Sequence, residues 1–304
     1  MTEQTSSSPA ERAWVEHNQR VFDIAYRLTG SITEAEDIAQ ETSIRLMRAD
    51  FGSIDDVLGW LVTVSSRLSV DRLRLHENSR RSYVGPWLPE PLVSAFDDEI
   101  ANRVTLDETV GMALLVVLDQ MTPAERTAFV LHDVFDVPFD EIGQIVGRSS
   151  AATRQLASRA RRRIQAAPTA TRPPADPEHH RELVERFAKA CSLGDLEGLT
   201  ALLAADVVGD FDSGGYLSNA PLTELDGAGP VARQLINTVS GIGATFEAIE
   251  VNGNPGVAVR LGQTIAAVIS IGVCNGAIDL LHGIGNPAKL GHLQPPGQPF
   301  FNRP

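Results

Sequence analysis

The sequence predicts a multidomain protein with two all-α domains followed by an α+β domain. Apolar residues recur at helical spacing in two successive blocks, which is typical of amphipathic helices around small cores. A third block contains short helical segments followed by runs of Val, Ile and Ala that favour β-strands. Proline-containing segments separate the blocks and predict linkers. The expected limits are 1–81 and 97–166 for the all-α domains, 82–96 and 167–178 for the linkers, 179–290 for the α+β domain and 291–304 for an irregular tail.

Several local signals place the ends of individual elements. Gly30 with Ser31 predicts the end of the first helix, and Thr33 with Glu36 has capping-box spacing for the second helix. Asn275-Gly276 predicts a tight hairpin, because both residues tolerate the positive φ angles that such a turn requires. Three prolines within residues 86–91 exclude a helix there. Strands are expected at 244–251, 257–261, 264–273 and 277–283.

The distribution of charge points to DNA. The chain has 304 residues and a formal net charge of −13, which disfavours indiscriminate binding to phosphate. Six arginines and no acidic residue nevertheless lie between Gly147 and Ile164, and such a local basic surface indicates focused contact with DNA. Two cysteines, Cys191 and Cys274, are too few for a disulfide framework, so a reduced, cytoplasmic location is expected. No apolar run has the length of a membrane-spanning helix, and no membrane contact is expected.

Residues 122–164 have the pattern of a helix-turn-helix. Thr122-Pro123 is a helix start, residues 139–146 form a short helix, and Gly147 begins a turn into a basic second helix. In this motif the second helix enters the major groove, where its early exposed residues contact bases and its later arginines contact phosphates. A solvated basic helix end is the alternative, and the turn that precedes the helix weighs against it. The DNA-binding residues expected are Arg148, Ser150, Thr153, Arg154, Ser158, Arg161 and Arg162.

Three motifs resemble those of the extracytoplasmic-function RNA polymerase sigma factors. Residues 35–42, Ala-Glu-Asp-Ile-Ala-Gln-Glu-Thr, are similar to the family's core-polymerase-binding helix. Trp60-Leu61 followed by residues 67–74 is similar to its promoter-melting helix, and residues 118–126 are similar to the start of its second domain. The order of these motifs is more specific than any one of them. The resemblance implies core RNA polymerase and promoter DNA as partners and requires no covalent chemistry of this chain.

The same resemblance assigns roles to residues of the first domain. Asp37, Gln40 and Glu41 share one helical face, which suits docking on a basic coiled coil of the polymerase. Promoter melting and contact with the minus-ten element are expected of Phe51, Trp60, Arg67, Arg72 and Arg74. For Trp60 we expect a packing role, and for Phe51 an apolar plug is favoured over stacking on a base.

The third block resembles SnoaL-like domains, also called nuclear-transport-factor-two-like (NTF2-like) α+β cones. Asp212-Ser213-Gly214-Gly215 is similar to an Asp-Gly-Gly-Gly motif of sigma factors that carry this fusion, although Ser213 departs from it. Residues 87–92 and 286–290 are similar to the linker and closing motifs of the same SigJ-like subgroup. We expect the latter two segments to meet across the domain boundary, and the tail to limit the polymerase-competent arrangement. The regulatory interdomain residues expected are Trp87, Leu88, Pro89, Asp212, Gly214, Gly215, Asn286, Pro287 and Lys289.

Two other functions remain open at this point. A helix-turn-helix regulator that senses a small ligand in the cone is one, although it leaves the first domain unexplained. An enzyme of the cyclase or isomerase type is the other, with Asp210, Asp212, Tyr216 and His282 as candidate residues. A turn-making role is favoured for Asp212, because it precedes two glycines. No metal-ligand spacing is present, so no metal is expected. The favoured sigma-factor interpretation requires no cofactor and no catalytic residue. In that interpretation the fused domain also removes the need for a separate anti-sigma factor.

Overall fold

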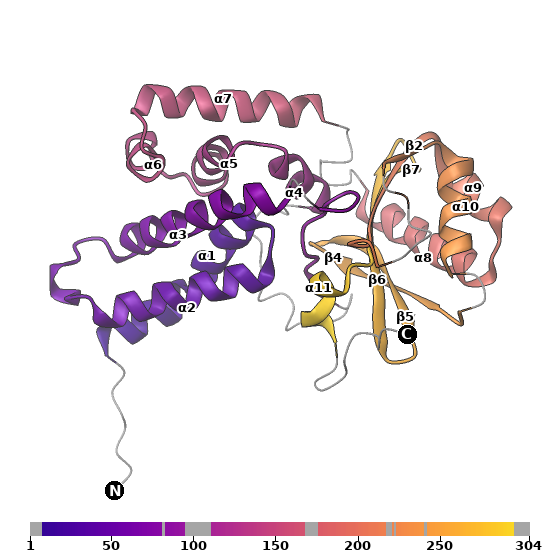
Figure 1. The fold of residues 1–304 in the computed structure, drawn as a ribbon, viewed down its shortest axis with the longest axis horizontal. Coiled ribbons are helices and arrows are strands. Elements are labelled where there is room, and N and C mark those ends of the chain that lie inside the picture. The colour runs from indigo at the N-terminus through magenta and orange to yellow at the C-terminus, as the bar shows by residue number, and fades with distance from the viewer. Residues whose placement is uncertain are drawn as a thin grey trace, which may run out of the picture. The chain divides into compact units, whose positions relative to one another are not determined.

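The chain divides into two compact units in the computed structural model. The first unit comprises Met1–Asn78 and Leu118–Gln165, and the second comprises Ser79–Val117 and Ala166–Pro304. The boundary therefore falls inside helix α4, Met112–Asp119. Figure 1 shows the elements in chain order. The structure describes residues 8–80, 83–94, 111–167, 176–216, 221, 223–239 and 242–294.

The first unit begins with three helices around a small apolar core. They are α1 (Pro9–Thr29), α2 (Ile32–Arg48) and α3 (Val57–Arg80), with a 3₁₀ turn at Phe51–Ser53 before α3. Gly30 ends α1 in the left-handed conformation, as predicted, because a residue without a side chain adopts it readily.

The start of α2 differs from the capping box predicted at Thr33 and Glu36. Ser31 is the N-cap residue, and its hydroxyl accepts a hydrogen bond from the backbone N–H of Glu34. Thr33 lies inside the helix, so that part of the prediction is wrong by two residues. The signal was ambiguous because Ser31 and Thr33 are both good N-cap residues, and Glu34 and Glu36 each follow one of them by three positions.

The second part of the first unit is the predicted helix-turn-helix. It consists of α5 (Pro123–Phe129), a π-helical turn at Val130–Val134, α6 (Phe139–Val146) and α7 (Ser150–Ala166). Thr122 and Glu125 cap α5 reciprocally, which confirms the predicted start. Gly147 ends α6 with a φ of 71°, a conformation that favours glycine and turns the chain into α7.

Two arginines, one buried and one exposed, join the two parts of the first unit. The Arg126 guanidinium is buried, and it donates hydrogen bonds to the Asp119 carboxylate and to the Arg27 carbonyl oxygen, each over 3.0 Å. Arg20 donates to the carbonyl oxygen of Phe135 over 2.9 Å and lies 4.6 Å from the centroid of its ring. Burial of the Arg126 charge is tolerable because carboxylate and carbonyl oxygens compensate for lost water.

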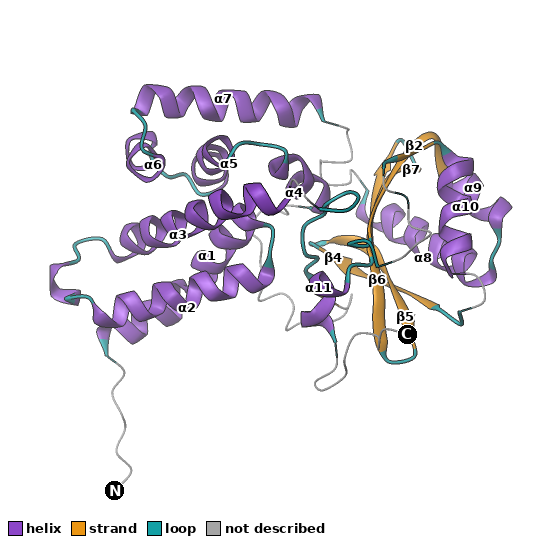
Figure 2. Ribbon diagram, viewed as in Figure 1, coloured by secondary structure: helices purple, strands orange, loops and turns teal. Residues whose placement is uncertain are grey.

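The second unit is built on one seven-stranded sheet of order β1-β4-β5-β6-β7-β2-β3. Figure 2 shows strands of this sheet in orange. Strand β2 runs parallel to β7, and the other neighbours are antiparallel. The strands are β1 Val93–Ser94, β2 Leu203–Asp212, β3 Leu225–Asp226, β4 Thr245–Val251, β5 Asn254–Leu261, β6 Thr264–Cys274 and β7 Ala277–Ile284. Asn275 and Gly276 have φ angles of 50° and 79°, which confirms the predicted hairpin turn.

Helices cover one face of this sheet and enclose the larger core. They are α8 (Pro177–Leu193), α9 (Leu196–Leu202) and α10 (Ala228–Val239), and they lie on the same side of the sheet in Figure 1. Phe187, Val231 and Leu281 are among the buried residues between helices and sheet. The α+β architecture predicted for this part of the chain is confirmed.

The opposite face packs against α11 and against two segments that were expected to lie outside the α+β domain. Leu88 from the expected linker, Met112 from α4 and Leu290 from α11 (Pro287–Leu290) form a second core on it. The expected linker also contributes β1, whose Val93 and Ser94 pair with Val251 and Glu250 of β4. Beyond α11, Gly291–Leu293 forms a 3₁₀ turn where irregular backbone was expected.

No helix in the part of the chain that the structure describes is long and apolar enough to cross a membrane.

Candidate functional site

The second helix of the helix-turn-helix, α7, exposes most of the residues predicted to bind DNA. Arg148, Arg154, Ser158 and Arg162 are exposed, and Ser150 is partly exposed. Thr153 is fully buried, and its hydroxyl donates to the Ser149 carbonyl oxygen over 3.0 Å. The expectation that Thr153 is exposed is therefore wrong. Its position faces the helical core, and its small side chain satisfies its own hydrogen bond there.

Three of the arginines of α7 bond to polar groups on other segments of the same unit. Arg159 lies 3.2 Å from Glu125 and Arg161 lies 2.6 Å from Asp133, so both pair with carboxylates of the same unit. Arg163 donates to the Gln120 carbonyl oxygen over 2.8 Å. Arg161 was predicted to contact phosphate, and its ion pair with Asp133 would compete with that contact.

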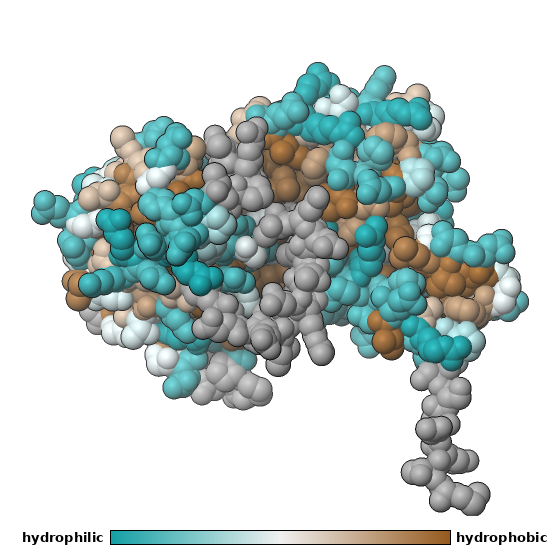
Figure 3. Space-filling view, turned by 180° about the vertical axis from the view of Figure 1, so that it is seen from behind, coloured by the Kyte–Doolittle hydropathy of each residue, from teal (hydrophilic) through white to brown (hydrophobic). Residues whose placement is uncertain are grey.

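The polar face predicted to dock on polymerase is present on α2. Asp37 and Gln40 are exposed, whereas the Glu41 carboxylate accepts a hydrogen bond from Arg45 over 2.8 Å. An exposed pair of this spacing contributes only a few tenths of a kcal/mol, so Glu41 is available to a stronger partner. Figure 3 shows the molecule from behind, and the surface drawn there mixes teal hydrophilic residues with brown hydrophobic ones.

The residues predicted for promoter melting lie on and before α3. Phe51 and Trp60 are partly buried and pack against the core of α1–α3, as expected for a plug and an anchor. Arg67, Arg72 and Arg74 are exposed, and Arg74 lies 3.6 Å from Asp71.

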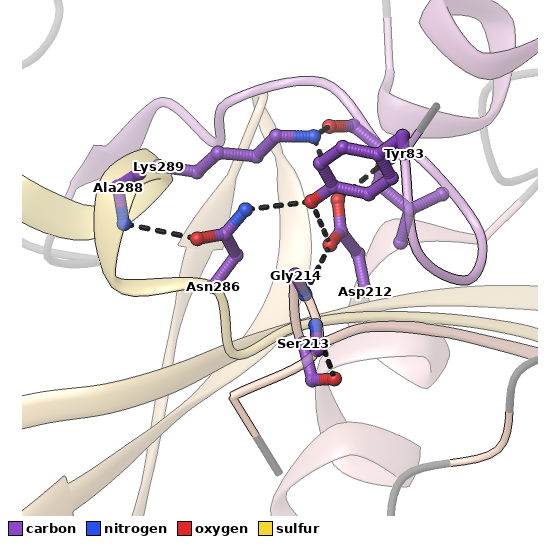
Figure 4. Close-up of polar contacts among 9 residues, drawn as sticks. Tyr83, Asp212, Ser213, Gly214, Asn286, Ala288 and Lys289 are labelled. Carbon is purple, nitrogen blue, oxygen red and sulfur yellow. Dashed lines mark hydrogen bonds and ion pairs between the residues drawn. The ribbon is translucent and has the colours of Figure 1, made fainter. Parts of the chain in front are cut away.

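In the second unit the Asp212 carboxylate anchors the expected linker on the sheet (Figure 4). One oxygen accepts hydrogen bonds from the Tyr83 hydroxyl over 2.5 Å and from the Gly214 N–H over 3.0 Å. The other accepts from the Leu88 N–H over 2.9 Å and from the Lys289 ammonium over 2.6 Å. Each oxygen thus has two donors, which is about the full accepting capacity of a carboxylate.

Lys289 joins this carboxylate to the expected linker. Its ammonium is buried, and it also donates to the Leu88 carbonyl oxygen. It lies 3.7 Å from the centroid of the Trp87 ring, a favourable position for a cation over an aromatic face. The segments at 87–92 and 286–290 therefore meet, as predicted, although both belong to one compact unit. We call Tyr83, Trp87, Leu88, Asp212, Asn286 and Lys289 the clamp.

Tyr83 is a member of the clamp that the sequence analysis missed. It donates to Asp212 and accepts a hydrogen bond from the Asn286 side chain over 2.6 Å. Burial, followed by the hydrogen bond to the Asp212 carboxylate, raises the pKa of its hydroxyl. No local signal marks Tyr83, because its partners lie 129 and 203 residues further along the chain.

The turn after β2 explains which residues of its motif are constrained. Gly214 has a φ of 59°, and a Cβ there would lie 2.7 Å from Asn286. Gly215 has a φ of 78°, again the region that favours glycine. Ser213 is not among the residues with positive φ, so the departure from the family motif causes no strain, and its hydroxyl accepts from the Gly215 N–H. The turn-making role favoured for Asp212 is confirmed by its bond to Gly214.

The remaining predicted residues support the clamp from both segments. Asn286 caps α11 by accepting from the Ala288 N–H, and Pro287 occupies the first helical position. Pro89 is buried. Beyond α11, a ring nitrogen of His292 lies 3.0 Å from the Pro91 carbonyl oxygen.

Two other candidates for catalysis, Asp210 and His282, lie on the same face of the sheet as Asp212. Asp210 is in register with His282, and His282 with Ser270, across β2, β7 and β6. Burial and the nearby carboxylates of Glu224 and Asp226 raise the pKa of Asp210 to about 6. Burial lowers the pKa of His282 to about 4. Tyr216 is exposed. Among the described residues, no group of histidines, cysteines or carboxylates is arranged to hold a metal ion.

Comparison with known proteins identifies both helical parts. Sigma-70 region 2 matches residues 14–78, and Sigma-70, region 4 matches residues 111–164. Together these regions define a transcription-initiation protein of the sigma-70 class.

Relatives that extend over nearly the whole chain narrow the class. The probable ECF RNA polymerase sigma factor SigI of Mycobacterium tuberculosis is 35% identical over 94% of this chain and 96% of its own length. The ECF RNA polymerase sigma factor SigJ of Mycobacterium tuberculosis is 39% identical over 90% of each chain. The crystal structure of that organism's SigJ superimposes with a TM-score of 0.73 over 91% of this chain and 98% of the other, at 35% identity. The chain belongs to the extracytoplasmic-function family of RNA polymerase sigma factors, and its function is in transcription initiation.

The clamp predicts a large effect of removing the Lys289 charge. Lys289→Met leaves the buried Asp212 carboxylate without its ion-pair partner, and such a loss costs about 3–5 kcal/mol. We expect a lower denaturant midpoint for the C-terminal unit of the full-length protein, measured by hydrogen exchange of strands β2 and β7. Lys189→Met, at an exposed position on α8, is the control and should change stability by less than about 0.5 kcal/mol. Equal stability of the two variants would contradict the clamp.

Buried His282 predicts a loss of stability in acid. Its pKa is lower in the folded state than in the unfolded state, so only the unfolded chain gains a proton as the pH falls from about 6.5 to about 4. The wild type should lose up to about 3 kcal/mol across this window relative to His282→Gln, as measured by thermal unfolding at each pH. Asp210 acts in the opposite direction because its pKa is raised to about 6. As the pH falls through this value, the wild type should gain stability relative to Asp210→Asn. Parallel pH profiles for the wild type and His282→Gln would contradict this assignment.

Proposed function

We propose that this chain binds core RNA polymerase, recognises promoter minus-thirty-five and minus-ten elements, and is regulated by its own C-terminal domain. The observation that carries the regulatory part is the Asp212–Lys289 clamp, which holds the segment between the two sigma regions on the C-terminal sheet. The helix-turn-helix and the exposed face of α2 support the other two parts.

Docking on polymerase is assigned to the polar face of α2. Asp37 and Gln40 are exposed, and Glu41 is held only by a neighbouring arginine of the same helix. A negative face of this kind complements a basic coiled coil, and the attraction increases the association rate as well as specificity.

Promoter opening is assigned to α3 and the turn before it. Arg67, Arg72 and Arg74 are exposed along the helix, where they can contact the backbone of a displaced single strand. Phe51 and Trp60 keep the preceding turn packed on the helical core, so the surface that meets the melted strand is rigid.

Recognition of the upstream element is assigned to the exposed residues of α7. Arg154 lies early in the helix, where base contact is expected, and Arg162 lies two turns later, where phosphate contact is expected. Ser150, Ser158 and Arg148 complete this surface. Thr153 is left out because it is buried, and Arg161 is given a supporting role through Asp133.

Regulation follows from where the connector, residues 83–94 of the expected linker, is held. Its backbone at Leu88 both donates to Asp212 and accepts from Lys289, and Val93–Ser94 extends the sheet as β1. A segment added to a sheet edge gains backbone hydrogen bonds with little dependence on its sequence. The C-terminal domain thereby sets how much of the connector is free, and it does so without a separate anti-sigma factor.

An enzymatic role is not part of the proposal. The two oxygens of the Asp212 carboxylate accept four hydrogen bonds from groups of this chain, so no accepting position is left for a substrate donor.

Reversal of charge on the α2 face tests docking. The paired substitutions Asp37→Lys and Glu41→Lys should lower association with core polymerase at least tenfold, measured by pull-down and by run-off transcription. Glu182→Lys with Glu185→Lys, at exposed positions on α8, makes the same change of charge on the other unit and should leave association unchanged. Normal association of the α2 variant, with a normal circular dichroism spectrum, would remove the docking assignment.

Staged C-terminal deletions test regulation. A chain ending after Leu290 keeps Lys289 but loses the His292 contact with Pro91 and the two Gln294 contacts with Ile265. Loss of a few hydrogen bonds should free the connector and raise run-off transcription about two- to tenfold. A chain ending after Gln294 keeps these bonds and should transcribe like the intact protein. A chain ending at Ala167 loses the whole clamp and should transcribe weakly. Equal transcription by all four folded proteins would exclude regulation by the C-terminal domain.

A further inference from the structure

An aromatic residue outside the predicted DNA-binding set contacts Arg154. The Arg154 guanidinium carbon lies 5.5 Å from the centroid of the Phe139 ring. Phe139 is the first residue of α6, and Arg154 is the fifth residue of α7. Within the helix-turn-helix, one helix thus presents a ring to an arginine on the helix that follows.

The turn between the two helices brings these residues together. Gly147 ends α6 in the left-handed conformation, and a Cβ at Gly143 would lie 2.6 Å from the Arg148 carbonyl oxygen. The chain therefore passes α6 closely as it turns into α7. Thr153 points into the core, so Arg154, one residue further around the helix, is directed outward.

Phe139 is itself held by His132. The two ring centroids are 3.7 Å apart with an interplanar angle of 33°. The Nδ1 atom of His132 lies 3.1 Å from the Val137 carbonyl oxygen. A carbonyl oxygen only accepts, so Nδ1 carries the proton of that bond, and the ring orientation is fixed. The π-helical turn at Val130–Val134 places His132 there.

Arg154 differs from Arg159, Arg161 and Arg163, which follow it on α7. Arg159 and Arg161 have carboxylate partners within 3.2 Å. Over the described residues, no carboxylate lies within ion-pair distance of Arg154. Its charge is supported by a ring face, which leaves the N–H edge of the guanidinium unoccupied by an acceptor.

We propose that Phe139 is a positioning residue that sets base specificity through Arg154. A guanidinium over an aromatic face keeps its planar fork of donors free, and this fork matches the O6 and N7 acceptors of guanine in the major groove. The ring limits the orientations of a long, flexible side chain before DNA arrives, so less conformational freedom is lost on binding. The inference rests on the proposed role of α7 in reading the promoter.

The test uses holoenzyme made from the full chain and core polymerase, with a randomised duplex library at the upstream element and sequencing of bound DNA. Arg154→Ala should relax preference at one base position by about fivefold or more. Phe139→Leu should relax preference at the same position by about two- to fivefold, the loss expected for an exposed cation–π contact. The double variant should be no less selective than Arg154→Ala alone, because the ring acts only through the arginine.

Two further variants separate positioning from general damage. Phe139→Tyr keeps an aromatic face and should retain wild-type preference. Arg162→Ala should weaken binding to all sequences and flatten the salt dependence, whereas Phe139→Leu should leave the salt dependence unchanged. Phe139→Met, of similar volume, repeats the test should leucine lower the helical content measured by circular dichroism.

The outcomes distinguish the inference from the function on which it rests. Wild-type preference in folded Phe139→Leu and Phe139→Met, with relaxed preference in Arg154→Ala, overturns the role of Phe139 alone. Additive losses in the double variant overturn it as well. Unchanged preference in Arg154→Ala overturns base reading by α7, and the inference with it.

Discussion

The arrangement of the C-terminal unit depends on one buried ion pair, between Asp212 and Lys289. Both side chains are almost completely withdrawn from water, and such a pair is stable only when the remaining hydrogen-bonding capacity is also satisfied. Here the connector supplies that satisfaction, because Leu88 gives its N–H to the carboxylate and its carbonyl oxygen to the ammonium. Removal of the connector would leave the pair short of partners, and removal of the pair would leave the connector without its anchor. The two are therefore mutually dependent.

This dependence explains why the connector belongs structurally to the C-terminal domain. A proline-containing segment with three large apolar residues has little tendency to form a helix, but it loses little conformational entropy on docking. Leu88 is buried in the second core with Met112 and Leu290, and Val93 pairs with the edge strand β4. An edge that is covered in this way is also protected from pairing with other chains.

In the helical unit, the partners of each arginine show which guanidinium groups are already engaged. Six arginines lie from Arg148 to Arg163, and their spacing in the sequence does not show which of them pair with carboxylates. The carboxylates of Glu125 and Asp133 hold three of them, while Arg154 is held by a ring. A salt-bridged arginine stabilises the position of α7, and an arginine without a carboxylate keeps its charge and its donors for DNA.

Features that depend on neighbouring residues could be predicted from the sequence. The cap at Thr122, the glycine turns at Gly30 and Gly147 and the Asn275-Gly276 hairpin all follow from interactions within a few positions, so their residue types predict them. The sequence also indicated the family, since the order of several motifs is specific. The burial of Thr153, the place of Tyr83 in the clamp and the pairing of the connector as β1 became visible only in the folded chain. These contacts join residues more than a hundred positions apart, or depend on which side of a helix faces the core, and neither is encoded in local spacing.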